Sequence, residues 1–384
     1  MKRRLLTPLI LAAGFVLTGC SSIGNWFGGG SEKLKPAALV EFKASLAVRP
    51  VWSLNLGEAR PYVLTPGTDG ESIYAASRRG SLHRIDPASG REAWRVETGK
   101  TLSGGVGVGD GLVLVGTDKG ELLAYHSVDG QPAWQARLSG EILTPPVAGL
   151  GLVAARSNDG NLYLLDAADG KRRWVQGRAL PALILREPGQ LALTPSALFA
   201  GHPGGKLSAH ALGNGAPLWE ANVTLPRGTN ELERIADVSG PLGIAQNLIC
   251  AVAYQGRLAC FEPRSGNAVW GRDFSGLSGV ELAGRWLFAV DDAGTVQAFD
   301  AARGIGVWKQ DKLRDRRPST PLALGRFVAT GDFEGYVHLL DGDTGAFVAR
   351  VATDGSPIVG QMLALDRGFV VQTAKGGVFA FKID

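Results

Sequence analysis

Histidines and aspartates are the side chains of this 384-residue chain that could bind a metal or transfer a proton. Four histidines occur at the same place in different copies of a repeat, and the fifth falls in an expected turn: His83, His126, His210 and His338, and then His202. Metal ligands usually follow one another at shorter, characteristic spacings. Four aspartates recur six residues after a repeat glycine, where turn residues are expected: Asp86, Asp166, Asp300 and Asp341. The sequence also has no nucleophile elbow, phosphate loop or zinc-protease motif, so we predict no catalytic residue, metal or cofactor.

Cys20 lies at the end of a segment that resembles a bacterial lipoprotein signal. Basic residues at 2–4 precede an apolar run at 5–17, and residues 17–20 read Leu-Thr-Gly-Cys. This resemblance to the lipobox implies that the signal peptide 1–19 is removed and that Cys20 is acylated. Ser21 follows, where an inner-membrane retention signal has aspartate, so we expect a lipid anchor on the periplasmic face of the outer membrane. Residues 20–45 comprise the lipidated cysteine and a flexible tether.

Cys250 and Cys260 flank a turn around Gly256 on two adjacent predicted strands. If the connecting loop holds three residues, the two cysteines face each other across the hairpin, and an oxidising periplasm permits a disulfide. Other copies of the repeat have apolar residues at these places. Two buried free thiols are therefore the alternative.

The elements that must position these residues form a repeat of about 40 residues. Seven glycines are each followed ten residues later by a second glycine, as in Gly160 and Gly170, and in six copies a tryptophan such as Trp174 comes fourteen residues after the first. Between the glycines the sequence alternates like a strand, the second glycine suits a hairpin turn, and two more strands precede the first glycine. Four strands per copy predict the blade of a β-propeller, with the tryptophan packed between neighbouring sheets.

The two ends of the chain complement each other. Residues 51–56, which include Trp52, look like an outer strand without a blade, whereas the last copy, around 376–381, lacks its outer strand. We therefore predict an all-β, eight-bladed β-propeller over residues 46–384. Its blades are four-stranded and antiparallel, and the N-terminal strand completes the last blade and closes the ring.

The propeller region is nearly neutral in charge. Removing the three basic residues of the signal from 40 leaves 37 against 36 acidic ones. A sequence of this kind lacks the basic surface typical of nucleic-acid binding, and we expect no nucleic-acid partner.

Two consecutive copies have the longest stretches between a tryptophan and the next repeat glycine, 31 residues after Trp174 and 37 after Trp219. If both lie between an outer strand and the next inner strand, they emerge side by side on one face, where repeat proteins usually bind partners. Leu183 and Leu185 beside Arg186 have the apolar and arginine character of an interface. The second stretch offers acidic counterparts, Glu231, Glu233 and Asp237. The alternative is that both are loops without a binding role, whose leucines fold inward.

Together these features resemble the BamB family, the propeller lipoproteins of the outer-membrane β-barrel assembly machinery. The resemblance covers the lipobox, the tether and the eight blades, and residues 181–186 and 231–238 are similar to the family's segments before the fourth and fifth blades. It implies a non-catalytic scaffold that binds a periplasmic POTRA domain of the barrel subunit BamA and assists outer-membrane protein insertion. The residues that match the family's binding motif are Leu183, Leu185, Arg186 and Asp237. Ser239 stands where the family often has a second aspartate, so one charge contact of the family is not expected here.

One further expectation accompanies this function, and two alternatives to it are a quinoprotein dehydrogenase and a glycan-binding propeller. Exposed blade edges could accept unfolded outer-membrane proteins by strand addition. Quinoprotein dehydrogenases share a similar glycine and tryptophan repeat around pyrroloquinoline quinone and calcium, but this chain has no adjacent cysteine pair and few long insertions to cap a pocket. A periplasmic glycan-binding propeller would expose aromatic side chains around its central channel.

Overall fold

The computed structural model describes residues 35–186 and 189–384. Cys20, the signal 1–19 and most of the expected tether lie outside the described residues. A compact unit extends over Pro36–Asp384, and the regular structure in the described ranges consists of 32 strands. None of these residues forms a helix long and apolar enough to cross a membrane.

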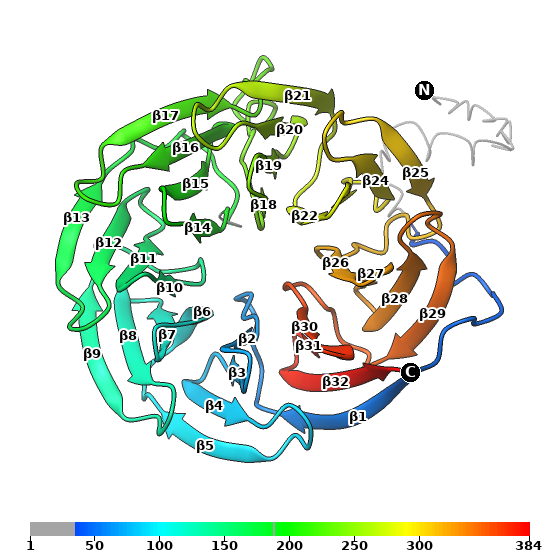
Figure 1. Cartoon of the computed structure of the whole chain (residues 1–384), viewed down its shortest axis with the longest axis horizontal. Helices are drawn as coiled ribbons and strands as arrows, with labels where there is room; N and C mark the ends of the chain where they lie inside the picture. Colours follow the sequence, from blue (N-terminus) through cyan, green and yellow to red (C-terminus); the bar gives the residue numbers. More distant parts are fainter. Residues whose placement is uncertain (1–34, 187–188) are drawn as a thin grey trace, which may run out of the picture. The chain divides into compact units, whose positions relative to one another are not determined.

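The strands form four-stranded antiparallel sheets arranged in a ring (Figure 1). In the first seven blades the strands follow one another from the centre outward. The first four blades are β2 (Gly67–Thr68), β3 (Ile73–Ala76), β4 (Ser81–Ile85) and β5 (Glu92–Glu97); β6 (Leu102–Gly109), β7 (Leu112–Thr117), β8 (Glu121–His126) and β9 (Pro132–Arg137); β10 (Val147–Gly149), β11 (Leu152–Arg156), β12 (Leu162–Asp166) and β13 (Arg172–Gln176); and β14 (Leu191–Leu193), β15 (Leu198–His202), β16 (Lys206–His210) and β17 (Pro217–Asn222).

The last blade combines the two ends of the described chain. The remaining blades are β18 (Gly243–Ile244), β19 (Ile249–Val252), β20 (Arg257–Phe261) and β21 (Ala268–Asp273); β22 (Val280–Ala283), β23 (Trp286–Val290), β24 (Val296–Asp300) and β25 (Gly306–Gln310); β26 (Leu322–Leu324), β27 (Phe327–Gly331), β28 (Tyr336–Asp341) and β29 (Phe347–Ala352); and β30 (Leu363–Leu365), β31 (Gly368–Gln372), β32 (Gly377–Ile383) and β1 (Val48–Asn55). Because β1 pairs antiparallel with β32, the predicted eight-bladed ring and its closure by the N-terminal strand are confirmed.

Burial explains why the middle strands are mostly apolar. Every residue of β11 is buried, whereas in the outer strand β13 only Trp174 is. A middle strand has a neighbouring blade on each side, so both of its faces are removed from water. The outer strand has solvent along one edge and alternates instead.

Apolar clusters fill the spaces between neighbouring blades, and the described residues contain one for each of the eight junctions. At the seam, Ile73 of blade 1 packs with Val370 and Ala380 of blade 8. The core is therefore divided into eight layers between sheets, and the seam has a layer of its own.

Each repeated tryptophan contacts the hairpin turn of the next blade, where its ring packs on the second repeat glycine. The Nε1 atom of Trp52 donates to the carbonyl of Pro87 in blade 1 at 2.9 Å. A Cβ atom at Gly90 would lie 2.5 Å from the Trp52 ring, which is too close. Gly90 also has φ +72°, a conformation that favours glycine, so both sterics and backbone conformation require glycine there. The other six tryptophans repeat this contact, which confirms that they pack between sheets: Trp94, Trp134, Trp174, Trp219, Trp270 and Trp308.

Ala349 replaces the tryptophan in blade 7 for a topological reason. The partner of each tryptophan is the hairpin turn between the third and fourth strands of the next blade. In blade 8 those strands are β32 and β1, which no hairpin joins because they lie at opposite ends of the sequence. Leu46 and Val48 pack instead against the apolar cluster that contains Ala349.

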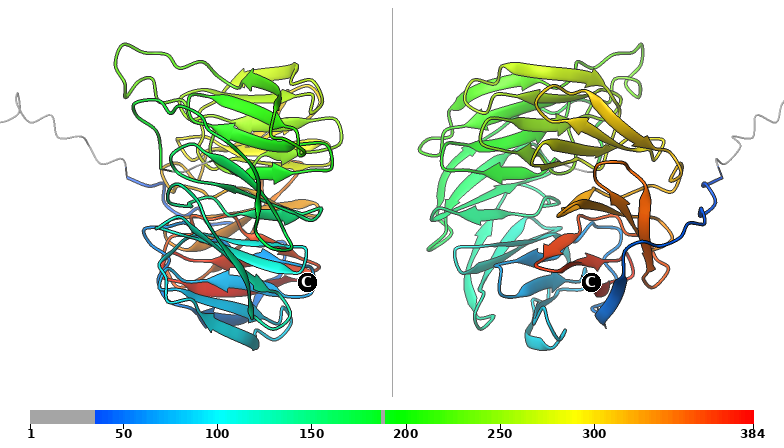
Figure 2. Two further views of the ribbon diagram at one scale, coloured as in Figure 1. Left: turned by 90° about the vertical axis from the view of Figure 1, so that its left-hand side faces the viewer. Right: turned by 45° about the vertical axis from the view of Figure 1, so that its right-hand side comes forward.

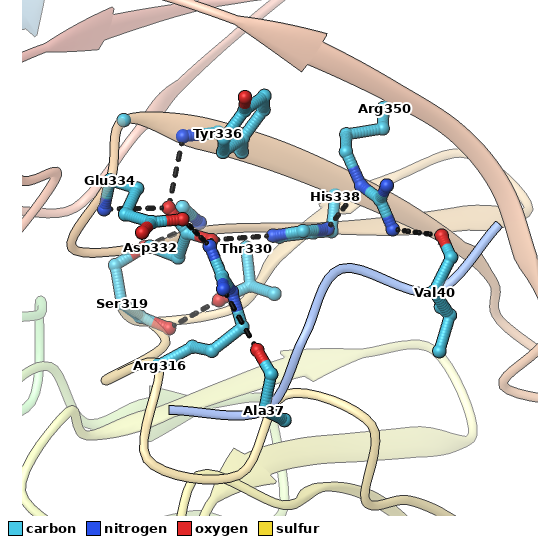
Figure 3. A network of polar contacts seen from close by, with 12 residues as sticks. Ala37, Val40, Arg316, Ser319, Thr330, Asp332, Glu334, Tyr336, His338 and Arg350 are labelled. Atoms are coloured by element: carbon cyan, nitrogen blue, oxygen red, sulfur yellow. Dashed lines mark hydrogen bonds and ion pairs between the residues drawn. The ribbon is translucent and has the colours of Figure 1, made fainter. Parts of the chain in front are cut away.

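The segment 36–45, expected in the tether, lies against blade 7 (Figure 3). Arg316 donates to the carbonyl of Ala37 and Arg350 to that of Val40, both at 2.9 Å. Behind these arginines, the buried Asp332 accepts from Arg316 Nε at 2.8 Å and lies 2.9 Å from His338 Nε2. The compact unit thus begins at Pro36, earlier than the predicted boundary at residue 46.

Candidate interaction site

Strand direction places the two insertions on one face. Strands alternate in direction within a blade, so all connections from an outer strand to the next inner strand emerge on the same face as the turns between second and third strands. The connections 177–190 and 223–242 join blades 3, 4 and 5 on this face, which we call the insertion face. Figure 2 shows the second of them, in green, projecting beyond the sheets.

The two insertions contact each other directly. Gln190 N donates to the carbonyl of Gly240 at 2.9 Å, and Gly189 and Gly240 form a parallel bridge. The carboxylate of Asp237, in the second insertion, accepts from Leu185 N at 2.6 Å through Oδ2. The predicted neighbouring arrangement of the insertions is confirmed.

Asp237, which was expected to contact a partner, is bonded inside the protein. Its side chain is buried, with 2% of the residue exposed, and its second oxygen accepts from Gly204 N at 3.1 Å. Burial raises the pKa of this carboxyl, and the bonds from Leu185 and Gly204 lower it in part. Because both oxygens are occupied inside the protein, Asp237 holds the first insertion against blade 4.

The first insertion presents its leucines and arginine differently. Leu183 is exposed over 42% of its surface, whereas Leu185 is partly buried. The Arg186 side chain is largely exposed, and its Nη2 donates to both carboxylate oxygens of Glu141 at 2.8 and 3.0 Å. Its guanidinium also lies 5.7 Å from the ring centre of Tyr62. Leu183 is therefore open to a partner, and Arg186 is held in position by the blade 2 to blade 3 connection.

The acidic residues of the second insertion are partly used to shape it. Glu233 N donates to Asn230 Oδ1 at 3.0 Å, and Glu233 Oε2 accepts from Thr229 N at 2.7 Å. This reciprocal pair caps a single helical turn. The turn leaves Leu232 exposed over 67% of its surface, beside Glu231.

Two cavities open beside Arg186. One, of about 220 Å³, lies between blades 3 and 4 beneath the first insertion and is lined by Leu185, Arg186 and Asp237 among others. The other, of about 230 Å³, is lined by connections from all around the ring and marks the mouth of the central channel. Tyr62 is the aromatic side chain among its described lining residues. Glu141 and Arg156, which shape the first cavity, have no repeat signal by which sequence reasoning could find them.

The histidines are distributed as expected, with one exception. His202 was expected in a turn but is the last residue of β15. Its Nε2 lies 2.6 Å from Ser208 Oγ, which is 2.9 Å from Nε2 of His210. Adjacent strands bring these residues together, which spacing along the sequence does not reveal. Among the described residues no group of three or more His, Cys, Asp or Glu side chains could hold a metal ion.

The repeated aspartates serve the turns. Oδ1 of Asp86 accepts from Ser89 N at 2.8 Å, and Asp300 and Asp341 make equivalent bonds. Asp166 instead accepts from Arg173 Nε at 2.6 Å.

Cys250 and Cys260 are directly paired residues of β19 and β20, and their sulfur atoms are joined in a disulfide. Ala253 N donates to the carbonyl of Arg257, so the loop between the strands holds the three residues 254–256. Both cysteines are fully buried.

The ring and its two joined insertions define the class of protein: an eight-bladed propeller of the kind found in both assembly factors and quinoproteins. BamB from Moraxella catarrhalis superposes with a TM-score of 0.81 at 24% identity, covering 88% of this chain and 100% of that chain. Quinohemoprotein alcohol dehydrogenase from Comamonas testosteroni superposes at 0.70 with 13% identity, covering 87% and 76%. At these identities the similarity shows a shared fold alone.

Sequence comparison identifies the family. The model of the family "Outer membrane protein assembly factor BamB" matches residues 78–310 and 292–384. Proteins of that name from Bordetella pertussis and Nitrosomonas eutropha are 38% identical over 371 residues and 40% identical over 391 residues. The alignments cover 96% and 99% of this chain and 95% of each relative. The chain belongs to the BamB family, which confirms the resemblance drawn from the sequence.

Proposed function

We propose that this protein is a non-catalytic scaffold lipoprotein of the outer-membrane protein assembly machinery. Its relatives are named outer membrane protein assembly factors. In this proposal acylated Cys20 anchors it to the periplasmic face of the outer membrane, and the joined insertions bind a periplasmic POTRA domain of BamA. Binding places the propeller where it assists the folding and insertion of barrel proteins.

The observation that carries the proposal is the bond between the insertions. Asp237 fixes the backbone at Leu185, so Leu183 and Arg186 are displayed from a held loop. A preorganised loop loses less conformational entropy on binding than a free one. The exposed Leu183 offers apolar surface to a partner, and Arg186, already oriented by Glu141, offers charge-assisted hydrogen bonds.

The test is co-purification with BamA from detergent-solubilised envelopes. Leu183→Ser combined with Arg186→Ala should abolish co-purification while shifting the thermal unfolding midpoint, Tm, by less than about 2 °C, because both residues are exposed and neither belongs to a core cluster. A large fall in Tm would instead mean that the two residues belong to the core.

A matched control changes the same residue types on the opposite face. Leu150 is exposed over 55% of its surface in the turn between β10 and β11, and Arg91 is exposed in the turn between β4 and β5. Leu150→Ser with Arg91→Ala should leave co-purification intact. Equal loss in both double variants would refute the assignment of binding to the insertions.

The non-catalytic part of the proposal has its own test. Pyrroloquinoline quinone, calcium and an alcohol are added to the purified protein, and reduction of a dye is followed. No turnover is expected, and turnover would contradict the scaffold proposal. Capture of unfolded barrel proteins at the outer strands is a secondary proposal, favoured by exposed apolar side chains on β13, β17 and β21: Val175, Leu218 and Val269.

A further inference from the structure

The cavity of about 220 Å³ between blades 3 and 4 contains a buried cation that no carboxylate among the described residues neutralises. Arg156, at the end of β11, is 6% exposed. Its Nη1 donates to the carbonyl of Gly189 at 3.0 Å, and its Nη2 has no hydrogen-bond partner in the described part of the chain. Burial, and then the nearby Arg178, lowers the pKa of Arg156 to about 10. A buried guanidinium with no anionic partner and one unpaired nitrogen is costly, so its retention calls for a ligand.

A second polar atom in the same cavity is also unpaired. Thr144 is 2% exposed, and its Oγ1 has no partner among the described residues. Such orphaned buried side-chain atoms are few in the described residues, and two of them line this one space. A single water needs only about 10–15 Å³ of cavity volume. This cavity, of about 220 Å³, therefore has room for a larger polar group.

The other charged groups of the wall are already paired. Glu141 accepts from Arg186, and Asp237 accepts from two backbone N–H groups. Arg178 is paired with Glu220, which also accepts from Lys206 Nζ. Among these charged groups of the described wall, Arg156 is the one with a buried side-chain nitrogen that has no hydrogen-bond partner.

We propose that this cavity is a binding pocket for a monovalent carboxylate on a short alkyl stem. The planar fork of Arg156 matches the two oxygens of a carboxylate, and Thr144 can donate a further hydrogen bond. Leu143, Leu180, Ile184 and Val238 supply apolar surface for the stem. A single unpaired cation balances a carboxylate better than a doubly charged phosphate.

The ligand has two possible sources, a free small carboxylate or an acidic side chain of a bound protein. Leu185 and Arg186 line the cavity as well as the insertion face, so a glutamate of a docked partner would reach it from there. The second source rests on the proposed function. The existence of the pocket does not, and propionate alone tests it.

The experiment measures Tm in 100 mM sodium propionate against sodium chloride of equal ionic strength. A ligand that binds only the folded state, present at about ten times its Kd, should raise Tm by about 2–3 °C. Arg156→Met should abolish this rise and leave Tm in chloride unchanged or higher, because it removes a buried unpaired charge. Arg272→Met is the matched control: its Nε donates to a backbone carbonyl of Gly304 far from the cavity, and the rise should persist.

Other variants keep the proposal falsifiable if Arg156→Met fails to fold. Leu180→Trp fills the cavity without changing Arg156 and should also abolish the rise. No rise in the unmodified protein would overturn the proposal. A rise of Tm in propionate that appears only in the Glu187→Gln variant would also overturn the proposal. The carboxylate that pairs with Arg156 would then belong to this chain and not to a ligand. The same propionate is then added during co-purification with BamA. If it reduces co-purification, the natural ligand is an acidic side chain of the partner. If co-purification is unchanged, the natural ligand is a free small carboxylate.

Discussion

At the scale of single residues, Asp237 shows how a side chain expected at a surface can act from beneath it. Its two oxygens accept from Leu185 N and Gly204 N, in the first insertion and in the turn after β15. The residue was expected to contact a partner because it matches the binding motif of the family that the sequence resembles. Only burial distinguishes an aspartate that positions a loop from one that contacts a partner.

Asp237→Ala should leave two partly buried N–H groups without acceptors and destabilise the fold by about 1–3 kcal/mol. Hydrogen exchange, followed by mass spectrometry, should accelerate in peptides covering 180–190 and 200–206 before the rest of the ring. Asp273→Ala, at a side chain 99% exposed, serves as the control. Equal exchange in both variants would show that the bond to Leu185 does not hold the insertion.

The disulfide is a second residue-scale prediction. Cys250 and Cys260 should resist alkylation in denaturant until a reductant is added, which mass spectrometry of the peptides measures. Replacing both by alanine should cost at most about 2–3 kcal/mol, because the bond closes a short loop that the hairpin already aligns. Alkylation of both without reductant would establish the alternative of two buried thiols.

At the scale of elements, the contact between tryptophan and glycine joins each blade to the next. Seven tryptophans make it, and Ala349 does not because the next blade has no hairpin turn to receive the indole. The exception to the repeat thus follows from the way the ring closes.

Restoring the repeat consensus at this site should therefore do harm. Ala349 is 3% exposed and packs with Leu46 and Val48, so Ala349→Trp should overpack the junction between blades 7 and 8 and destabilise the protein by about 1–3 kcal/mol. Ala346→Trp, at an exposed turn position of blade 7, is a suitable control, and chemical denaturation measures both. A stabilised Ala349→Trp variant would contradict this account of the missing tryptophan.

At the scale of the whole molecule, the N-terminal segment enters on the insertion face. Ala37 N donates to the carbonyl of Arg314, in the connection between blades 6 and 7, at 2.9 Å. Phe42 stacks on Phe347 with ring centres 5.4 Å apart. The compact unit therefore begins on the same face as the two insertions.

A pair of truncations tests where the propeller begins. A chain starting at residue 36 should have the same Tm as one starting at residue 21. A chain starting at residue 46 loses the bonds from Arg316 and Arg350 and exposes Phe347, so its Tm should fall by several degrees. Identical Tm values for all three would restore the boundary at 46.

The stability of the whole ring should depend on pH through its buried histidines. Burial, aided by nearby cations, lowers the pKa of His202, and burial also lowers those of His210 and His338. Below the ordinary value of 6.5 the unfolded chain binds protons that the folded chain refuses, so stability falls as pH decreases from about 7 to 5. Each histidine contributes up to about 1.4 kcal/mol per pH unit. Urea unfolding measures the slope, which His202→Gln should reduce; a flat profile would disprove the prediction.

The sequence by itself determined the strands, the blade and the number of copies, because these depend on local alternation and on glycines that turns require. It also located both insertions, since a fixed repeat makes any added length visible. Tertiary structure alone decided that Asp237 is buried, that Glu141 orients Arg186 and that Arg156 lines a cavity with its Nη2 unpaired. These depend on contacts between blades, and no spacing along one chain reveals which side chains meet across two sheets.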